Sequence, residues 1–364
     1  MRLFHTVSAL ALGGALVLSQ QPAAAAPRYA YKVVPLAGQG SYATAINASG
    51  QMAGRLTPSS GGEHGFRYSR GVLSDLGTLP GDADSIAWSI NKRGQVVGRS
   101  FGLGRPSRAF LYSDGVMRDI GTLPGGSEAV AFDINDRGDI VGDSTLQQHF
   151  GFAFLYRNGI MRNLGAFPGT DRSTAKAINN RGQVTGSSGV GPAQGPNGNQ
   201  THAFLWEHGV MRDIGTLGGL NSMGEDINEL GEVTGSSTRA GGDGDEKQWR
   251  GFVWSFGRMR DIGAPPGGSL IMPQAINTLG TVVGFYQAPN GQRAFLHRRG
   301  GATVDLNTLV DPAQGWVVTL AYDINDFGQV AGEACNVAFT ICGAVRLDPL
   351  PGGWLGLGAR APAP

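Results

Sequence analysis

The sequence predicts an all-β protein, a seven-bladed β-propeller made of four-stranded antiparallel blades. A nine-residue motif, Ile-Asn-x-x-Gly-x-Val-x-Gly or a close variant, occurs seven times, and its copies start 44 to 49 residues apart. Each repeat contains four short β-favouring runs and no helix-period segment. Seven units of four strands predict a closed ring, and a solenoid is the structural alternative. The copies begin at Ile46, Ile90, Ile134, Ile178, Ile227, Ile276 and Ile324.

The motif itself predicts a tight hairpin between the first two strands of each blade. Asparagine at the first corner of a four-residue turn bonds its own backbone, and glycine at the last corner accepts a positive φ. A later glycine within the second strand suggests a bulge or a close approach of neighbouring backbone. Because these residues recur in every repeat, we interpret them as scaffold. They are Asn47, Asn91, Asn135, Asn179, Asn228, Asn277 and Asn325, then Gly50, Gly94, Gly138, Gly182, Gly231, Gly280 and Gly328, then Gly54, Gly98, Gly142, Gly186, Gly235, Gly284 and Gly332.

The third and fourth strands come from a block such as Ala-Phe-Leu-Tyr-Ser-Asp-Gly-Val-Met-Arg-Asp-Ile at residues 109–120, where Asp-Gly makes the turn. Related blocks begin at Gly65, Ala153, Ala203, Gly251 and Ala294, with a degenerate seventh at Ala338. Residues 31–36 and residues 346–350 both resemble a spare fourth strand. One of them should complete the last blade and close the ring, and the sequence does not say which.

Composition and targeting signals predict an exported domain. The chain has 364 residues, 60 of them glycine, with 41% hydrophobic and 16% charged residues, which suits many short strands and turns. Residues 1–26 combine Arg2, an apolar run and an Ala-x-Ala site, as a secretory signal does. Residues 27–350 would form the propeller, and residues 351–364 a flexible tail. Loss of Arg2 balances 28 basic against 28 acidic residues, so neither nucleic acid nor an anionic membrane is an expected partner.

The two cysteines, Cys335 and Cys342, both lie in the last repeat. In an oxidising compartment we expect a disulfide between them, worth about 2–3 kcal/mol. Two unpaired thiols are the alternative, since a spacing of seven is not that of a directly opposed hairpin pair.

The blocks resemble the HAF repeat family, described as probable extracellular repeat proteins. The family's name triplet is present as His202-Ala203-Phe204, within a longer match that continues through Gly219 and then from Asp226 to Gly235. The resemblance extends over about residues 31–350 and implies export and a repeat fold, with no agreed activity. The histidine is replaced in other repeats by Arg108, Phe152, Arg250, Arg293 and Val337, which argues against shared histidine chemistry. Some members end in a membrane-spanning sorting segment; residues 354–364 have none, which predicts a soluble product.

Three groups of residues are candidates for function. If the first strand is innermost, Asp133, Asp226 and Asp323 could ring the central channel as a cation or acid/base site, or bond neighbouring strands. A glycine-rich loop carries Asp243, Asp245 and Glu246, a weak calcium motif for which a solvated turn is the alternative. Aromatic and arginine side chains expected to be exposed near variable loops suit a sugar or protein partner, and scattered surface side chains with no partner are the alternative. They are Phe101, Arg105, Trp249, Arg250, Tyr286 and Arg293.

The leading functional hypothesis is a monomeric, non-catalytic, secreted scaffold that presents a binding face to a protein or a glycan at the cell surface. No cofactor is predicted beyond the weak calcium motif. The alternative is a polysaccharide hydrolase or lyase that uses carboxylates at the channel mouth. A structural or matrix protein without a defined ligand is a third hypothesis. The sequence contains no phosphate loop or paired-histidine metal motif, and fold alone does not decide among these classes.

Overall fold

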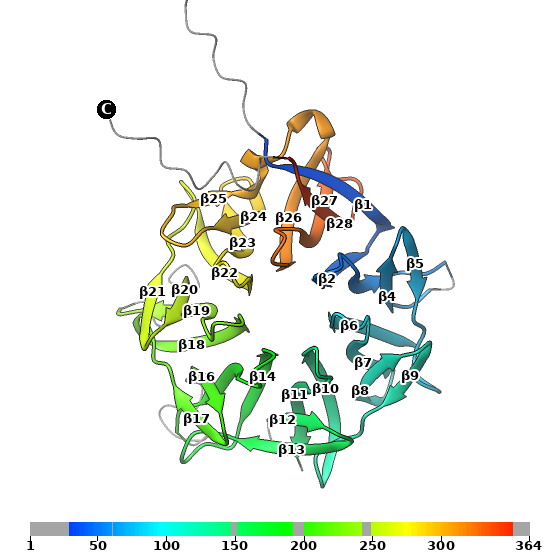
Figure 1. Cartoon of the computed structure of the whole chain (residues 1–364), viewed down its shortest axis with the longest axis vertical. Coiled ribbons are helices and arrows are strands. Elements are labelled where there is room, and N and C mark those ends of the chain that lie inside the picture. Colours follow the sequence, from blue (N-terminus) through cyan, green and yellow to red (C-terminus); the bar gives the residue numbers. More distant parts are fainter. Residues whose placement is uncertain (1–28, 60, 147–150, 192–199, 242–248, 352–364) are drawn as a thin grey trace, which may run out of the picture.

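The computed structural model describes residues 29–59, 61–146, 151–191, 200–241 and 249–351. These residues form seven four-stranded antiparallel sheets arranged in a ring, which confirms the predicted seven-bladed β-propeller (Figure 1). The first strand of each repeat lies innermost, around the central axis of the ring (Figure 1). The predicted signal sequence at 1–26 lies outside the described residues. Among the described residues, no helix has the length and apolar character needed to cross a membrane.

Blades one to six take their strands in sequence order from the axis outward, and blade seven takes its outermost strand from the N-terminal part of the chain. Blade one contains β2 (Tyr42–Ile46), β3 (Met52–Leu56), β4 (His64–Ser69) and β5 (Val72–Asp75), and blade two contains β6 (Asp84–Ile90), β7 (Val96–Gly102), β8 (Arg105–Ser113) and β9 (Val116–Asp119). Blade three contains β10 (Gly126–Ile134), β11 (Ile140–Leu146), β12 (Gly151–Arg157) and β13 (Ile160–Gly165), and blade four contains β14 (Ser173–Ile178), β15 (Val184–Gly189), β16 (Thr201–Glu207) and β17 (Val210–Asp213). Blade five contains β18 (Gly218–Ile227), β19 (Val233–Arg239), β20 (Trp249–Ser255) and β21 (Arg258–Asp261), and blade six contains β22 (Ser269–Ile276), β23 (Val282–Ala288), β24 (Gly291–His297) and β25 (Thr303–Asp305). Two short 3-10 turns, η2 (Leu306–Leu309) and η3 (Pro312–Gln314), lead to blade seven, which contains β26 (Trp316–Ile324), β27 (Val330–Asn336), β28 (Cys342–Pro349) and β1 (Tyr31–Gln39).

The N-terminal strand closes the ring. β1 pairs antiparallel with β28, with Val33 opposite Leu347, and forms the outer edge of blade seven (Figure 1). Residues 346–349 therefore belong to the third strand of this blade rather than to a fourth. The predicted degenerate block at Ala338 is wrong, because Ala338 and Phe339 lie in the turn between β27 and β28. In blade seven this turn takes the place of the variable loop that connects the second and third strands, since β27 continues to Asn336.

A disulfide joins Cys335 and Cys342 across this turn. The two residues sit directly opposite each other in the β27–β28 ladder, although their spacing in sequence had not suggested a directly opposed pair. A cross-link that closes a loop of this size stabilises a fold by about 2–3 kcal/mol.

The repeated asparagines form a closed ring of hydrogen bonds around the axis. In Asn91, Oδ1 accepts the backbone N–H groups of Arg93 and Gln95, and Nδ2 donates to Gln95 Oε1 at 2.8 Å and to the carbonyl oxygen of Asn135 in the next blade at 3.1 Å. The same interblade bond recurs at every junction, and Asn325 completes the circle by donating to Asn47. One side chain thus both shapes its own hairpin and joins two blades.

The two repeated glycines have different roles. The hairpin glycines adopt φ between 71° and 88°, as the turn requires. The strand glycine allows a close approach of backbone: a Cβ on Gly98 would lie 1.9 Å from the carbonyl oxygen of Ile86. At that point the inner strand bulges, because Ala87 and Ser89 pair with Gly98 and Val97 and leave Trp88 unpaired. The sequence had predicted a bulge or a close approach here, and both occur.

The hydrophobic core lies between blades. The phenylalanine of the third strand has no exposed surface in six blades. Phe110, for example, packs with Ala45 and Ala53 of the preceding blade. Each such ring contributes roughly 1.5–3 kcal/mol through its burial.

We expect Asn91→Asp to destabilise the propeller by about 2–4 kcal/mol, because the substitution replaces two donated hydrogen bonds with facing acceptors. The measurement is the free energy of unfolding in guanidinium chloride. Asn290→Asp, which places the same charge in an exposed turn of blade six, is the matched control. Equal unfolding free energies for the two variants would contradict a structural role of the asparagine ring.

Candidate functional site

The bulge in each inner strand places one unpaired residue beside the central axis, three positions before the hairpin asparagine. The bulge recurs in all seven blades. Whereas the flanking Ile-Asn pair is repeated, the bulged residue is of a different type in every blade. The seven residues are Thr44, Trp88, Phe132, Lys176, Glu225, Gln274 and Tyr322.

Four of these bulged residues interact with one another from blade to blade. The Trp88 and Phe132 rings have centroids 6.2 Å apart, and Lys176 Nζ lies 4.4 Å from the centroid of the Phe132 ring. Lys176 also attracts the carboxyl group of Glu225 in the following blade. The contacts form a continuous path across four blades, and the four side chains are half-buried.

A second variable position lies on strand two, directly after the strand glycine. Its residues are Arg55, Arg99, Asp143, Ser187, Ser236, Phe285 and Glu333. The Arg55 guanidinium stacks 4.6 Å from the centre of the Tyr42 ring, and Tyr42 lies 5.4 Å from Tyr322. We call the joined set the axial cluster. It comprises Tyr42, Arg55, Trp88, Arg99, Phe132, Asp143, Lys176, Glu225, Tyr322 and Glu333.

Burial perturbs the acidic members of the axial cluster. It raises the pKa of Asp143 to about 6, against the opposing pull of Lys176 and Arg99. It also raises the pKa of Glu225, opposed by Lys176, and that of Glu333, opposed by Arg55. The cluster therefore combines aromatic rings, fixed cations and carboxyl groups that gain a proton more readily than exposed ones, so it offers both stacking surfaces and hydrogen-bonding groups.

The three predicted channel carboxylates join neighbouring blades through hydrogen bonds. Asp226 Oδ1 accepts from the backbone N–H of Ile227, and its Oδ2 accepts from Ile276 of the next blade, both at 2.7 Å. Asp323 repeats this arrangement with Ile324 and Ile46. Asp133 bonds Ile134 and Ile178 in the same way and also accepts from the Ser89 hydroxyl. Both oxygens of each carboxyl group are thus engaged.

Burial raises the pKa values of these three groups, and repulsion from neighbouring carboxylates adds to the shifts. Burial raises the pKa of Asp226 to about 8, and the charges of Asp323 and Asp133 add to the shift. The pKa of Asp323 rises to about 7 and that of Asp133 also rises, again chiefly through burial. At neutral pH the carboxyl group of Asp226 therefore carries a proton.

Two of the predicted loop residues are not exposed. Tyr286 lies on β23 with 3% of its surface exposed, and its hydroxyl donates to Asp305 at 3.0 Å. Arg293 pairs with it across the ladder, is 9% exposed and stacks 5.3 Å from the centre of the Phe339 ring. The prediction of exposure is wrong for both, because the strands extend into the segment taken as a loop and Phe339 of blade seven covers Arg293.

The other four residues of this group are half-buried or exposed. Trp249 and Arg250 begin β20 and are half-buried. Phe101 is half-buried beneath the Arg99 guanidinium, and exposed Arg105 donates to the carbonyl oxygen of Gly81. Neither Trp249 nor Arg250 belongs to the axial cluster, so the structure does not gather the group into one site.

The histidine of the name triplet has a structural partner. His202 Nδ1 lies 2.7 Å from Asp213 of the outer strand, and His64 contacts Asp75 in the same way in blade one. The other oxygen of each aspartate accepts the backbone N–H two residues later. The recurring aspartate of the fourth strand thus forms a turn and a cross-strand bond.

The described residues offer one potential metal cluster, formed by Glu333, Cys335 and Cys342. Its two sulfurs form the disulfide, so they cannot act as thiolate ligands. The calcium motif at Asp243, Asp245 and Glu246 lies outside the described residues.

No protein-family model and no curated protein matches the sequence. Among solved structures, a puromycin-hydrolysing peptidase from Mycobacterium tuberculosis is 14% identical, with a TM-score of 0.55 over 93% of this chain and 56% of the peptidase. YCF48 bound to D1 peptide is 11% identical, with a TM-score of 0.52 over 87% of this chain and 96% of that protein. TolB from Acinetobacter baumannii is 11% identical with a TM-score of 0.46, and the chain spans 63% of its length. At these identities the similarity to the peptidase and to YCF48 concerns the fold alone.

We expect the stability of the propeller to fall as pH rises from about 5.5 to 8.5. The native pKa of Asp226, about 8, exceeds the value of about 3.9 for an unfolded aspartate, so in this window the native state holds a proton that the unfolded state has released. Unfolding free energies of the wild type at the two pH values should differ by on the order of 3 kcal/mol more than those of Asp226→Asn, which cannot titrate. Asp114→Asn, in an exposed turn, should keep the wild-type difference. An unchanged pH difference in Asp226→Asn would exclude the proposed proton uptake.

Proposed function

We propose that this protein is an exported, non-catalytic β-propeller of HAF-type repeats whose axial cluster binds a glycan or a protein at the cell surface. The observation that carries the proposal is the contrast between repeated and variable positions. Asn, Ile and Gly recur in every blade, whereas the bulged position beside them has seven different residue types. Scaffolding alone requires no such variety at one structural position.

The chemistry of the variable residues supports a polar ligand with flat apolar faces. Trp88, Phe132 and Tyr322 supply rings for stacking, while Lys176 and Glu225 supply charge and hydrogen bonds. Such pairings suit sugar rings and also the side chains of a protein partner. Rigid scaffolds commonly carry their binding residues in this way.

The alternative, a polysaccharide hydrolase or lyase, has weaker support. Its proposed carboxyl groups, on Asp133, Asp226 and Asp323, already accept backbone hydrogen bonds at both oxygens. A general acid or base needs a free position facing the substrate. Export of the chain rests on residues 1–26 and remains part of the proposal.

The test is binding of a panel of bacterial-surface oligosaccharides to the mature protein, measured by calorimetry, with an affinity capture of cell-surface proteins in parallel. The double variant Trp88→Ala/Phe132→Ala should weaken binding by roughly fivefold for each lost ring, because each stacked aromatic contributes about 1 kcal/mol. Lys176→Gln should weaken the binding of acidic ligands selectively.

Phe256→Ala is the matched control, since Phe256 is 95% exposed in an outer turn away from the axis. It should leave binding unchanged. Loss of binding in the control but not in the axial variants would place the binding face elsewhere. Turnover of any oligosaccharide, abolished by Asp226→Asn, would favour the enzyme instead.

A further inference from the structure

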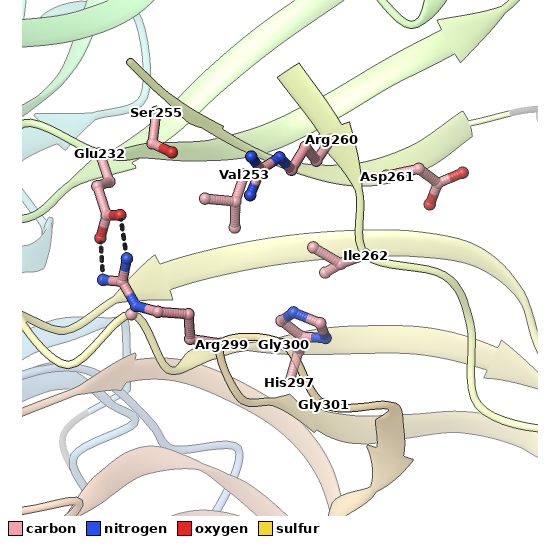
Figure 2. Close-up of a pocket in the computed structure, with 11 residues that line it drawn as sticks. Glu232, Val253, Ser255, Arg260, Asp261, Ile262, His297, Arg299, Gly300 and Gly301 are labelled. Atoms are coloured by element: carbon pink, nitrogen blue, oxygen red, sulfur yellow. Dashed lines mark hydrogen bonds and ion pairs between the residues drawn. The ribbon is translucent and has the colours of Figure 1, made fainter. Parts of the chain in front are cut away.

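A pocket lies between blades five and six, separate from the axial cluster, and has a volume of about 300 Å³. Its position follows from a departure in the repeat pattern. The third strand of blades one to five carries a tyrosine or a tryptophan two residues after its buried phenylalanine, and this ring fills the gap to the preceding blade. These residues are Tyr68, Tyr112, Tyr156, Trp206 and Trp254. Blade six has the smaller His297 there, and the space left is lined by His297 together with Val253 and Ile262 of blade five (Figure 2).

The charges around the pocket leave one cation without a partner. Arg299 binds Glu232 in a two-fold ion pair, with N–O distances of 2.6 and 2.7 Å, that spans the two blades (Figure 2). Asp261 is paired with Arg239, and its carboxyl group points away from the pocket (Figure 2). Arg260, which lies opposite Val253 in the ladder, has no hydrogen bond or ion pair with any described residue. The lining therefore favours an anion.

The hydrogen bonds around His297 determine which of its two ring nitrogens can accept a hydrogen bond from a ligand. The Thr303 hydroxyl donates its only proton to the carbonyl oxygen of Ile262, so it can only accept from His297 Nδ1, 3.0 Å away. Nδ1 therefore carries the proton and Nε2 is an unprotonated acceptor. Burial lowers the pKa of His297, which keeps the ring neutral at physiological pH.

We propose that this pocket binds a small organic carboxylate whose apolar body carries a hydroxyl group. Arg260 holds the carboxylate, Val253 and Ile262 contact the apolar body, and His297 Nε2 accepts the hydroxyl proton. The volume lies at the lower end of the range for small-molecule sites, and the two apolar side chains stand among polar and charged ones, which suits a small, polar ligand. The proposal does not depend on the function proposed for the axial cluster.

The test is calorimetric titration of the full mature chain with 4-hydroxybenzoate, compared with benzoate, which lacks the hydroxyl group, and with 4-hydroxybenzyl alcohol, which lacks the charge. The 4-hydroxybenzoate should bind best, and each analogue should bind about tenfold more weakly, because a charge-assisted or buried hydrogen bond is worth about 1.5 kcal/mol. Arg260→Met should reduce 4-hydroxybenzoate affinity by about tenfold or more.

Two further variants make the result specific. Arg212→Met alters the equivalent arginine of blade four, beside which Trp254 of blade five occupies the position of His297, and it should leave affinity unchanged. His297→Trp restores the ring found in blade five and should abolish binding while the melting temperature shows that the propeller remains folded. Absence of 4-hydroxybenzoate binding, or an equal loss in Arg212→Met and Arg260→Met, would overturn the proposal.

Discussion

The hydrogen bond from each hairpin asparagine to the next asparagine carbonyl is the interaction on which the rest of the structure depends. A propeller blade is a small sheet that cannot bury its own hydrophobic faces, so its neighbours must be held at a fixed spacing. The asparagine sets that spacing at the axis, while Oδ1 fixes the hairpin from which the blade begins. The bond from Asn325 to Asn47 makes the series a ring without ends. Once the axis is fixed, the buried phenylalanines of the third strands can pack between blades.

This rigid frame explains why the positions beside it can vary. Each inner strand bulges where the strand glycine lets the backbone approach, and the bulged residue makes no ladder pair. Because the ladder does not constrain this residue, it can be threonine in one blade and tryptophan in another without changing the fold. The residues that hold the fold together are therefore distinct from the variable residues at the bulged positions. The axial cluster is built largely from variable positions.

Much of the architecture could be read from the sequence, and the exceptions have physical reasons. The Asn-x-x-Gly hairpins and the four strands per repeat were predictable because turn chemistry and β-favouring runs are local. The third strand of blade seven was not, since Cys342–Pro349 lacks the Ala-Phe signature and is recognised only by its pairing with β27 and β1. The burial of Tyr286 and Arg293 could not be predicted from the sequence either, because it depends on contacts with a neighbouring blade. The axial cluster was missed because simple alternation singled out Asp133 rather than the bulged Phe132; comparing repeats position by position would have found it.

The closure of the ring by β1 has a consequence for how the molecule is assembled. Tyr31 pairs with Pro349, so β1 can complete blade seven only after β28, which lies far later in the chain, has been synthesised. Until then Val33 and the remainder of β1 present an unsatisfied edge, and blade seven lacks its cover. Contacts so distant in sequence slow folding in general, and an unpaired strand edge invites pairing between chains. Shielding of β1 until β28 is available would therefore limit pairing between chains.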